Sequence, residues 1–478
     1  ENIDTRKLYF TPVEVSADKA VMRLSFRADR YIDFIYTLLP ESYVVDLSVE
    51  AHNVENIFSS SAKRMNIVWE QILRQQEKGY TFEQQYTSLT YKPVGEDTEH
   101  LNERGDDSEK PEEPLSWVAF KNQFFSCIMV AKNNFNDVIL ESDTLHEGKG
   151  YLKVCTADMT APFDPSGRVA SDFSFYFGPN KFSTLKESNE LIGGEDNDLQ
   201  LQKLIYFGWP IVRWINRFFI MYLFDWLTSW GLSMGLVLLL LTLIVKAVVY
   251  PFTLKSYISS AKMRALKPYI DEINAKYPKQ EDAMKKQQEI MMLYSKYGAS
   301  PMGGCLPMLI QMPIFIAMFN FVPNAIELRQ QSFLWADDLS AYDSIIEFGH
   351  IPLLGDHISL FALLMALSMF FYSKISSAQM ADGGMPGMKF MSLYLMPIMM
   401  FFICNNLSSA LSYYYLLSNL ITMGMTWYIR KYVVTEEKVR AQMAAAAAKP
   451  RQKSKWQLRL EEAQRMQEQM QKERKNRR

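Results

Sequence analysis

Cysteine and histidine are both scarce in this chain of 478 residues. It contains four cysteines and five histidines, and neither type recurs at a spacing typical of a metal site. The HExxH, GxSxG and phosphate-binding loop motifs are also missing. These absences argue against the common metalloprotease, serine hydrolase and nucleotidase classes. We therefore expect a protein that is not an enzyme and that uses no cofactor or metal.

The cysteines also leave the question of disulfides open. Cys127 and Cys155 lie in the first 200 residues and could pair if this region is exported, but their spacing alone cannot decide this. Cys305 and Cys404 lie in apolar segments, where we expect them to be buried packing thiols.

Charge is distributed unevenly along the chain. Residues 1–200 contain 34 acidic and 20 basic residues, residues 201–434 contain 13 and 18, and residues 435–478 contain 6 and 13. This asymmetry favours a membrane protein whose two ends lie in different compartments. The chain begins at Glu1 rather than Met, so we expect an upstream signal peptide or signal-anchor helix to have been removed.

Residues 1–200 are predicted to form an acidic β domain, with a β-sandwich as the architecture. Short runs rich in Val, Tyr, Phe and Thr alternate with turn residues, for example YVVDLSVEAHNV and SWVAFKNQFFSCIMVA. The run IVWEQILRQQ at 67–76 is the one candidate helix, and the acidic stretch 96–114 is predicted to be disordered.

Residues 201–230 are predicted to form an amphipathic helix at the membrane surface. Trp209, Trp214, Trp226 and Trp230 suit the headgroup zone, whereas Pro210 and two arginines make a membrane span unfavourable.

Five apolar segments of spanning length follow within residues 231–434, at 231–252, 303–323, 357–375, 387–405 and 410–429. The loop 253–300 carries nine basic residues, whereas 324–356 carries one basic and six acidic residues. The positive-inside rule then places residues 1–200 outside, 253–300 inside and the C-terminus inside. The fold class is therefore an α-helical polytopic membrane protein with an N-terminal extracytoplasmic β-sandwich domain.

A basic helical hairpin is predicted over 254–298 within this loop. Its exposed cations, Lys262, Arg264, Lys267, Lys285 and Lys286, suit either contact with anionic lipid or a docking element that receives substrate.

Lys246 interrupts the apolar run LTLIVKAVVYP, with Thr242 one helical turn earlier on the same face. A charge at this depth is costly, so it suits a polar groove. Alternatively, Lys246 snorkels, since the cytoplasmic end of the span is roughly 9 Å away. Gln311 could bond between packed helices, and Tyr415 could belong to an aromatic belt.

Several strings within 230–434 resemble the YidC/Oxa insertase family. They are AKMRALKPYI, LYSKYG, PMGGCLPMLIQMPIFIA, FLWADDLSAYD and YYYLLSNL. The preceding acidic β domain and interfacial helix are similar to those of its Gram-negative bacterial members, which implies a first transmembrane segment upstream. The resemblance also implies a non-catalytic insertase and chaperone of the bacterial inner membrane, with residues 1–200 periplasmic. Nascent membrane proteins would enter a polar, positively charged groove, alone or beside the Sec translocon.

The same resemblance implies which residues line the groove. The family has an arginine where this sequence has Lys246, and Thr242, Gln311 and Tyr415 match other groove-facing positions. Because lysine can lose its proton when desolvated, the substitution leaves open whether the charge itself is needed.

The basic tail, residues 435–478, has two interpretations. It is either a solvated segment that enforces topology or a contact for ribosomal RNA phosphates, as the family's extended tails suggest. Its candidate contacts are Arg451, Lys453, Lys455, Arg459, Arg474, Lys475, Arg477 and Arg478.

A small-anion transporter or channel remains the alternative function, because an intramembrane cation also suits anion movement. Internal repeats or paired broken helices would favour a transporter, and the sequence displays neither.

Overall fold

A computed structural model of the chain describes residues 4–58, 62–194, 198–278, 282–299, 306–352, 354–377 and 390–448. The chain forms two compact units. Unit 1 contains residues 1–245, 311–371 and 394–420, and unit 2 contains residues 246–310, 372–393 and 421–478.

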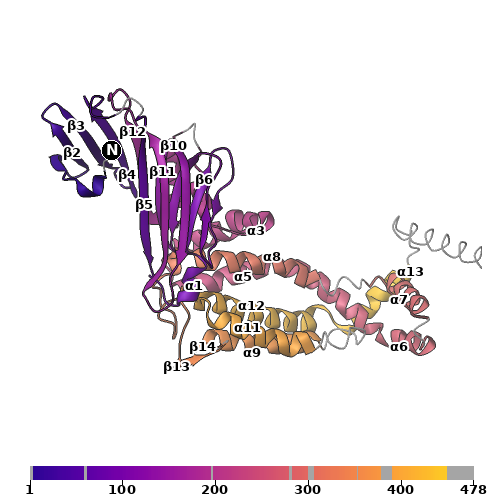
Figure 1. Ribbon diagram of the computed structural model, residues 1–478. Coiled ribbons are helices and arrows are strands. Elements are labelled where there is room, and N and C mark those ends of the chain that lie inside the picture. The colour runs from indigo at the N-terminus through magenta and orange to yellow at the C-terminus, as the bar shows by residue number, and fades with distance from the viewer. Residues whose placement is uncertain are drawn as a thin grey trace, which may run out of the picture. The chain divides into compact units, whose positions relative to one another are not determined.

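The first part of unit 1 is a β domain of twelve strands, drawn in indigo to magenta in Figure 1. A short helix, α1 (Tyr80–Gln84), interrupts the strands, and α2 (Phe182–Gly193) follows them. The strands are β1 (Thr11–Val15), β2 (Lys19–Arg27), β3 (Arg30–Leu38), β4 (Val44–His52), β5 (Arg64–Arg74), β6 (Ser88–Pro93), β7 (Glu99–His100), β8 (Asp107–Glu109), β9 (Leu115–Lys121), β10 (Phe125–Thr144), β11 (Tyr151–Pro162) and β12 (Ser171–Pro179).

Strand β10 belongs to two layers of the β domain. Its first half pairs with β9 and β12, and its second half pairs with β8 and β11, which in turn pairs with β5. The register shifts between the halves, where Asn134 and Asp137 have positive φ angles of 60° and 49°. Such irregularities bend a strand, so one strand can pass from one layer to the next.

Alternate residues of the central strands fill two separate cores. Val118 and Phe120 of β9 pack between the layers, where Trp69 of β5 stacks on Phe120 at 4.1 Å. Trp117 and Ala119 point to the opposite face. There the Trp117 indole nitrogen donates a hydrogen bond to the carbonyl oxygen of Leu199 at 2.8 Å. Burial on both faces explains the continuous apolar run of this strand.

The predicted sandwich is confirmed, with three local corrections. Residues 64–74 form strand β5 rather than a helix, because their alternate side chains face β9 and solvent. Residues 96–114 contain β7 and β8 and are ordered through pairing with β6 and β10. Strand β3 was not predicted, although it pairs along its full length with β2 and β4. Cys127 and Cys155 are both free thiols.

The segment that follows the β domain is helical from residue 210. It contains α3 (Pro210–Ile215), the π-helical η3 (Asn216–Ile220) and α4 (Met221–Thr228), after a short 3-10 turn η2 (Leu201–Leu204). All four tryptophans are exposed, from Trp226 at 51% to Trp209 at 70%. Pro210 occupies the first helical turn, where its missing N–H costs no hydrogen bond.

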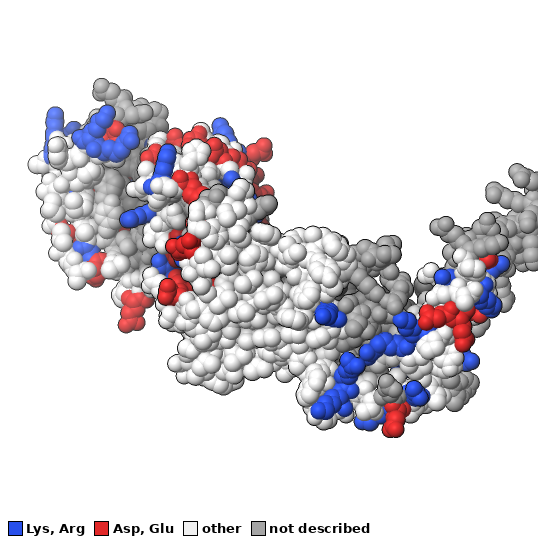
Figure 2. Space-filling view, turned by 90° about the horizontal axis from the view of Figure 1, so that it is seen from below, with Lys and Arg blue, Asp and Glu red and all other residues white. Residues whose placement is uncertain are grey.

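Each of the five predicted apolar segments contains a helix. These are α5 (Met234–Ala265), α8 (Leu306–Phe321), α9 (Leu360–Ser377), the π-helical η8 with α11 (Met391–Leu395 and Met396–Asn405), and α12 (Ser409–Tyr428). Among the residues that the structure describes, α5 alone is both long and apolar enough to cross a membrane. Figure 2 shows that the surface over these helices in unit 1 carries almost no charge.

The connection between α8 and α9, residues 322–359, contains two 3-10 turns and a hairpin. The turns are η6 (Val322–Asn324) and η7 (Ile326–Leu328), and the hairpin strands are β13 (Ile346–Ile351) and β14 (Gly355–Ile358).

Unit 2 contains the basic hairpin, and its first arm differs from the prediction. Helix α5 continues unbroken to Ala265 instead of ending near residue 253, because residues 252–265 contain no Gly or Pro that would stop it. The arms that follow are α6 (Lys267–Lys276) and α7 (Ala283–Tyr297), and Gly298 ends α7 at φ 63° as expected. Further on, η9 (Ile429–Val433) and α13 (Glu436–Ala448) complete the unit. Val439 and Met443 of α13 share an apolar cluster with Leu266 and Ala299.

Candidate functional site

Helix α5 carries two buried polar side chains one turn apart. Thr242 is 0% exposed, and its hydroxyl donates to the carbonyl oxygen of Leu238 at 2.6 Å. That bond lies within the helix, so Thr242 needs no partner from another element. Lys246 is 6% exposed. Lysine is almost never this buried unless its ammonium group contacts other polar groups. A snorkelling lysine would have its ammonium group exposed.

Tyr415 of α12 contacts α8 in two ways. Its hydroxyl donates to the carbonyl oxygen of Phe315 at 3.0 Å, and the two rings stack with centroids 4.2 Å apart. Tyr415 is 4% exposed, so it does not lie on the surface as an aromatic-belt residue would. Gln311 is half-buried and lies one turn before Phe315 on α8. The structure therefore brings Tyr415 to the turn of α8 that Gln311 begins.

One apolar cluster joins these helices in unit 1. Leu241 and Val245, which precede and follow Thr242 on α5, belong to the same cluster as Phe321 of α8 and Tyr415 of α12. A further polar contact connects α12 to α9, where the Asn419 amide donates to the Ser368 hydroxyl at 3.0 Å. Such bonds between apolar helices fix their register.

Asp343, in the connection between α8 and α9, caps the first turn of α9. Its carboxylate accepts hydrogen bonds from the backbone N–H groups of Leu360 and Phe361 at 2.9 and 3.1 Å. The Trp335 indole donates to the same carboxylate at 2.8 Å, and the Ser359 hydroxyl also donates to it. A negative charge is favourable at a helix N-terminus, where free N–H groups point outward.

Asn405, at the end of α11, bonds to the residues that directly precede α9. Its side-chain nitrogen donates to the carbonyl oxygens of Leu354 and His357, each at 2.9 Å. Its side-chain oxygen accepts from the Ser359 N–H at 2.9 Å. The His357 ring stacks on Tyr342 at 3.7 Å. Buried, satisfied polar groups therefore join this end of α9 to α11.

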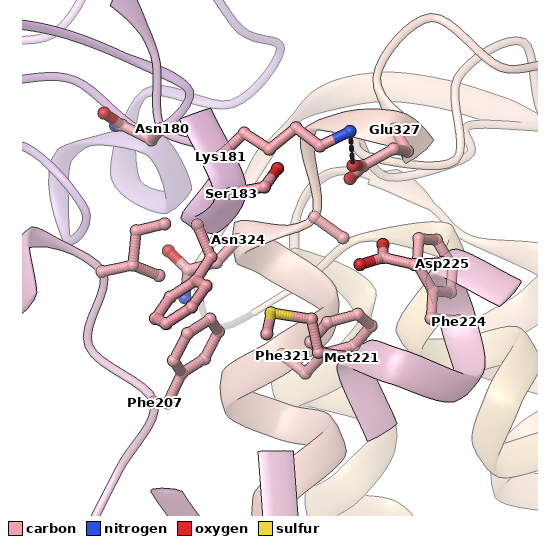
Figure 3. A pocket seen from close by; sticks show the side chains of 13 residues that line it. Asn180, Lys181, Ser183, Phe207, Met221, Phe224, Asp225, Phe321, Asn324 and Glu327 are labelled. Atoms are coloured by element: carbon pink, nitrogen blue, oxygen red, sulfur yellow. Dashed lines mark ion pairs between the residues drawn. The ribbon is translucent and has the colours of Figure 1, made fainter. Parts of the chain in front are cut away.

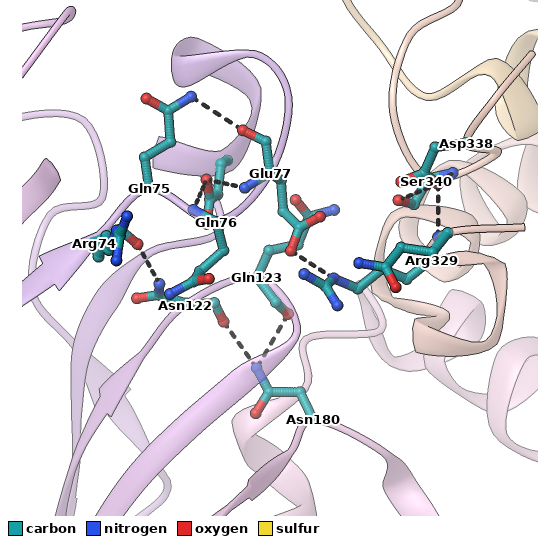
Figure 4. A network of polar contacts seen from close by, with 12 residues as sticks. Arg74, Gln75, Gln76, Glu77, Asn122, Gln123, Asn180, Arg329, Asp338 and Ser340 are labelled. Atoms are coloured by element: carbon teal, nitrogen blue, oxygen red, sulfur yellow. Dashed lines mark hydrogen bonds and ion pairs between the residues drawn. The ribbon is translucent and has the colours of Figure 1, made fainter. Parts of the chain in front are cut away.

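The β domain contacts the residues directly after α8, as Figure 4 shows. The Arg329 guanidinium donates to the Glu77 carboxylate at 2.7 Å. The side-chain nitrogen of Gln123 donates to the carbonyl oxygen of Pro323 at 2.9 Å. Burial raises the pKa of Glu77, while the Arg329 charge opposes that change.

A small cavity lies beside this contact, between α2, α4 and the end of α8 (Figure 3). On its wall the Lys181 ammonium pairs with Glu327 at 3.1 Å. Burial raises the pKa of Asp225, and the nearby Glu327 carboxylate raises it further. The cavity measures about 30 Å³. That volume suits about one water molecule, so it is not a site for a polypeptide segment.

Known proteins resemble both parts of the chain. A family profile described as "60Kd inner membrane protein" matches residues 226–437, and one described as "YidC periplasmic domain" matches residues 1–222. A membrane protein insertase YidC of Phocaeicola vulgatus is 53% identical over 434 residues, which is 90% of this chain and 70% of the relative. Its counterpart in Bacteroides fragilis is 48% identical over 479 residues, 99% of this chain and 77% of the relative.

The chain belongs to the YidC family of membrane protein insertases. It is therefore a bacterial inner-membrane protein that inserts other membrane proteins and is not an enzyme. Another relative, from Parabacteroides distasonis, is 44% identical over 98% of this chain and 74% of its own length.

The candidate residues of the basic hairpin lie in unit 2. Lys262 and Arg264 end helix α5, Lys267 begins α6, and Lys285 and Lys286 lie on α7. Figure 2 shows basic side chains gathered over this unit. The tail candidates from Arg451 to Arg478 lie outside the described residues.

Sequence reasoning missed the polar groups between α8 and α9. Asp343, His357 and Arg329 were counted only as loop charges or not singled out. A signal was available for Asp343, because it lies in the quoted string FLWADDLSAYD, which links this chain to the YidC family. Its partners Ser359 and Leu360 are 16 and 17 residues further on, so local sequence could not pair them.

Proposed function

We propose that Lys246, Thr242, Gln311 and Tyr415 line a polar groove that receives the hydrophobic segments of nascent membrane proteins. The observation that carries this proposal is Lys246 itself, a lysine 6% exposed and one turn from the fully buried Thr242. Polar residues at this depth of an apolar helix are costly and usually functional.

The proposed groove lowers the barrier to insertion in two ways. A cation in a low-dielectric pocket attracts an incoming acidic tail, since charge interactions strengthen away from bulk water. Polar walls also admit water, so a segment with polar flanks crosses a shorter apolar distance. The groove opens toward cytoplasm and lipid, and polypeptides are released sideways into the bilayer.

We further propose that five helices cross the membrane, namely α5, α8, α9, α11 and α12, with residues 1–200 periplasmic and the C-terminus cytoplasmic. The basic residues of α6 and α7 and the acidic connection between α8 and α9 support this orientation. The exposed tryptophans of α3 and α4 suit a helix lying in the outer headgroup layer.

The proposed partners follow from charge. The basic tail binds ribosomal RNA phosphates, and the hairpin cations Lys262, Arg264, Lys267, Lys285 and Lys286 dock arriving substrates. The insertase acts alone or beside the Sec translocon. The comparisons favour this function over a small-anion transporter, because the matching relatives are named as insertases.

Photo-crosslinking tests the groove. A photoreactive residue at Thr242 or Gln311 should capture nascent membrane proteins on stalled ribosomes. Leu243 offers a matched control on α5, because it is adjacent to Thr242 but 43% exposed. Adducts at Thr242 and Gln311 well above those at Leu243 would support the proposal. Equal labelling at all three positions, or none, would refute it.

A transport assay tests the alternative function. Movement of small anions across liposomes that contain the protein but fail to insert a single-span substrate would favour the transporter instead.

A further inference from the structure

Four side chains from three separate stretches of the β domain converge on the residues that follow α8. Gln123 bonds the Pro323 carbonyl at 2.9 Å, and Lys181 pairs with Glu327 at 3.1 Å. Glu77 pairs with Arg329 at 2.7 Å. Lys78 donates to the Ser344 hydroxyl at 2.8 Å. These contacts span the stretch from Pro323, just beyond the last turn of α8, to the residue that follows Asp343.

The central pair is well shielded from water. The Glu77 and Arg329 side chains are 8% and 20% exposed, and the Arg329 guanidinium also lies 5.4 Å from the centroid of the Phe125 ring. A pair this sheltered is screened less by salt than a surface pair. Removing one partner leaves the other charge poorly solvated, so each residue depends on the other.

The β-domain side of the contact is shaped in advance by Glu83. This fully buried carboxylate accepts hydrogen bonds from the backbone N–H groups of Gln76 and Glu77, at 2.9 to 3.1 Å. The bonds fold residues 75–79 into a turn that presents Glu77 and Lys78 outward. Figure 4 shows this turn and Arg329 on opposite sides of the contact.

Gly79 completes the turn and allows a close approach to Tyr342. Its φ of +93° is a conformation that side chains with a Cβ rarely adopt. A Cβ there would also lie 3.0 Å from the Cε1 atom of Tyr342. Tyr342 in turn stacks on His357, which belongs to the polar corner at the start of α9. The turn therefore contacts the connection at Arg329, Tyr342 and Ser344, and Tyr342 links it to the polar residues before α9.

We propose that the β domain braces the connection between α8 and α9 through this turn, and that Arg329 is a positioning residue for insertion. Arg329 does not touch substrate. It holds the connection that follows α8, the helix that carries Gln311 and accepts the Tyr415 hydrogen bond. The brace keeps the extracytoplasmic ends of α8 and α9 in place while a substrate segment moves sideways into the bilayer. The proposal rests on the insertase function and the proposed orientation, and it does not depend on which residues line the groove.

Charge reversal in the full-length protein tests the brace. The variants are Arg329→Glu, Glu77→Arg and the two combined, reconstituted in liposomes or nanodiscs. One readout is hydrogen exchange of residues 322–344, and the other is the rate of insertion of a single-span substrate. Each single variant should raise exchange in this segment roughly tenfold or more and slow insertion several-fold. The combined variant should restore both.

A second pair and a control keep the test decisive. Lys181→Glu and Glu327→Lys, alone and combined, should follow the same pattern at the neighbouring contact. The Arg23–Asp33 pair is a matched control, because its atoms are also 2.7 Å apart but it joins β2 to β3. Asp33→Asn should leave exchange of residues 322–344 and insertion unchanged.

Three outcomes would overturn the proposal. Unchanged exchange in the single variants would mean that the pair does not hold the segment. Raised hydrogen exchange of residues 322–344 together with normal insertion in the single variants would mean that the contact only docks the β domain and does not act in insertion. Failure of both combined variants to restore insertion would mean that charge complementarity is not what acts. Crosslinking of substrate at Thr242 tests the groove separately, so failure of the brace and failure of the groove are distinguishable.

Discussion

The hydroxyl of Tyr415 donates a hydrogen bond to the backbone carbonyl oxygen of Phe315, and the two rings stack at 4.2 Å. The two contacts join α12 to α8 at the turn that Gln311 begins. Few other hydrogen-bond donors are available among apolar helices, so the Phe315 carbonyl oxygen would not readily replace the Tyr415 hydroxyl.

Tyr415→Phe should therefore remove the hydrogen bond between α12 and α8 and keep the stacking of the two rings. We expect a loss of about 1 kcal/mol, the usual net value of one hydrogen bond, whereas Tyr415→Ala should cost about 3–5 kcal/mol through the cavity it leaves. Thermal unfolding in detergent would measure both. If Tyr415→Phe were as damaging as Tyr415→Ala, the hydroxyl rather than the ring would dominate.

Substitutions at Lys246 separate charge from polarity in the proposed groove. Lys246→Arg should support normal insertion, because arginine keeps a positive charge and is the residue that the family resemblance places there. Lys246→Glu should slow insertion strongly, and Lys246→Ala shows whether charge or mere polarity is required. The assay is insertion of a single-span substrate with an acidic tail into liposomes.

Lys255 provides the control for this series, because it is exposed and lies on the same helix. Lys255→Ala and Lys255→Glu should have little effect. Normal insertion by both Lys246→Ala and Lys246→Glu would show that insertion needs neither charge nor polarity at this position.

Asp343→Ala should destabilise the start of α9. It removes the acceptor for two backbone N–H groups, the Trp335 indole and the Ser359 hydroxyl. We expect a loss of about 2 kcal/mol or more, from a lost helix cap and lost bonds to a charged group. Asp337→Ala, at an exposed acid in the same loop, should change the unfolding temperature little.

Glu83 makes the stability of the β domain depend on pH. Burial raises its pKa from 4.5 to about 7, although the hydrogen bonds that its carboxylate accepts from the backbone N–H groups of Glu77 and Gln76 oppose the rise. Between these two values the folded state binds the proton and the unfolded chain releases it. Stability contributed by this group therefore falls as pH rises from about 4.5 to about 7.

Glu83→Gln should remove that contribution. The difference in unfolding temperature between wild type and Glu83→Gln should change between pH 5 and pH 8, measured on the full chain. A difference that is the same at both pH values would show that Glu83 does not titrate in this range.

Local patterns predicted the elements of this fold more reliably than their ends. The five apolar segments each became a helix because apolar composition over such lengths leaves few alternatives. Helix α5 overran its predicted end by more than three turns, since nothing between Phe252 and Ala265 stops a helix. Residues 67–76 carry apolar side chains at spacings that fit a helix or a strand, and only the pairing with β11 decides between them.

The site was predictable only in part. Thr242 and Lys246 share one helix, so their common face follows from spacing alone. Tyr415 and Phe315 are 100 residues apart, and Glu77 and Arg329 are 252 apart. Contacts at such separations depend on how whole elements pack, which no local pattern records. The acidic residues between α8 and α9 indicated only on which side of the membrane this connection lies. In the structure Asp343 also accepts hydrogen bonds at the start of α9, and Glu327 pairs with Lys181.

Helix α5 also fixes the spacing between two of the proposed contact residues. It runs 32 residues without a break, from Met234 through Thr242 and Lys246 to the basic residues Lys262 and Arg264. At 1.5 Å per residue, Lys246 and Lys262 are held roughly 24 Å apart along the axis. An extended chain of about seven residues covers that distance. In the proposed function, a nascent segment that contacts both lysines at once must bridge this spacing, shortened only by the reach of the two lysine side chains.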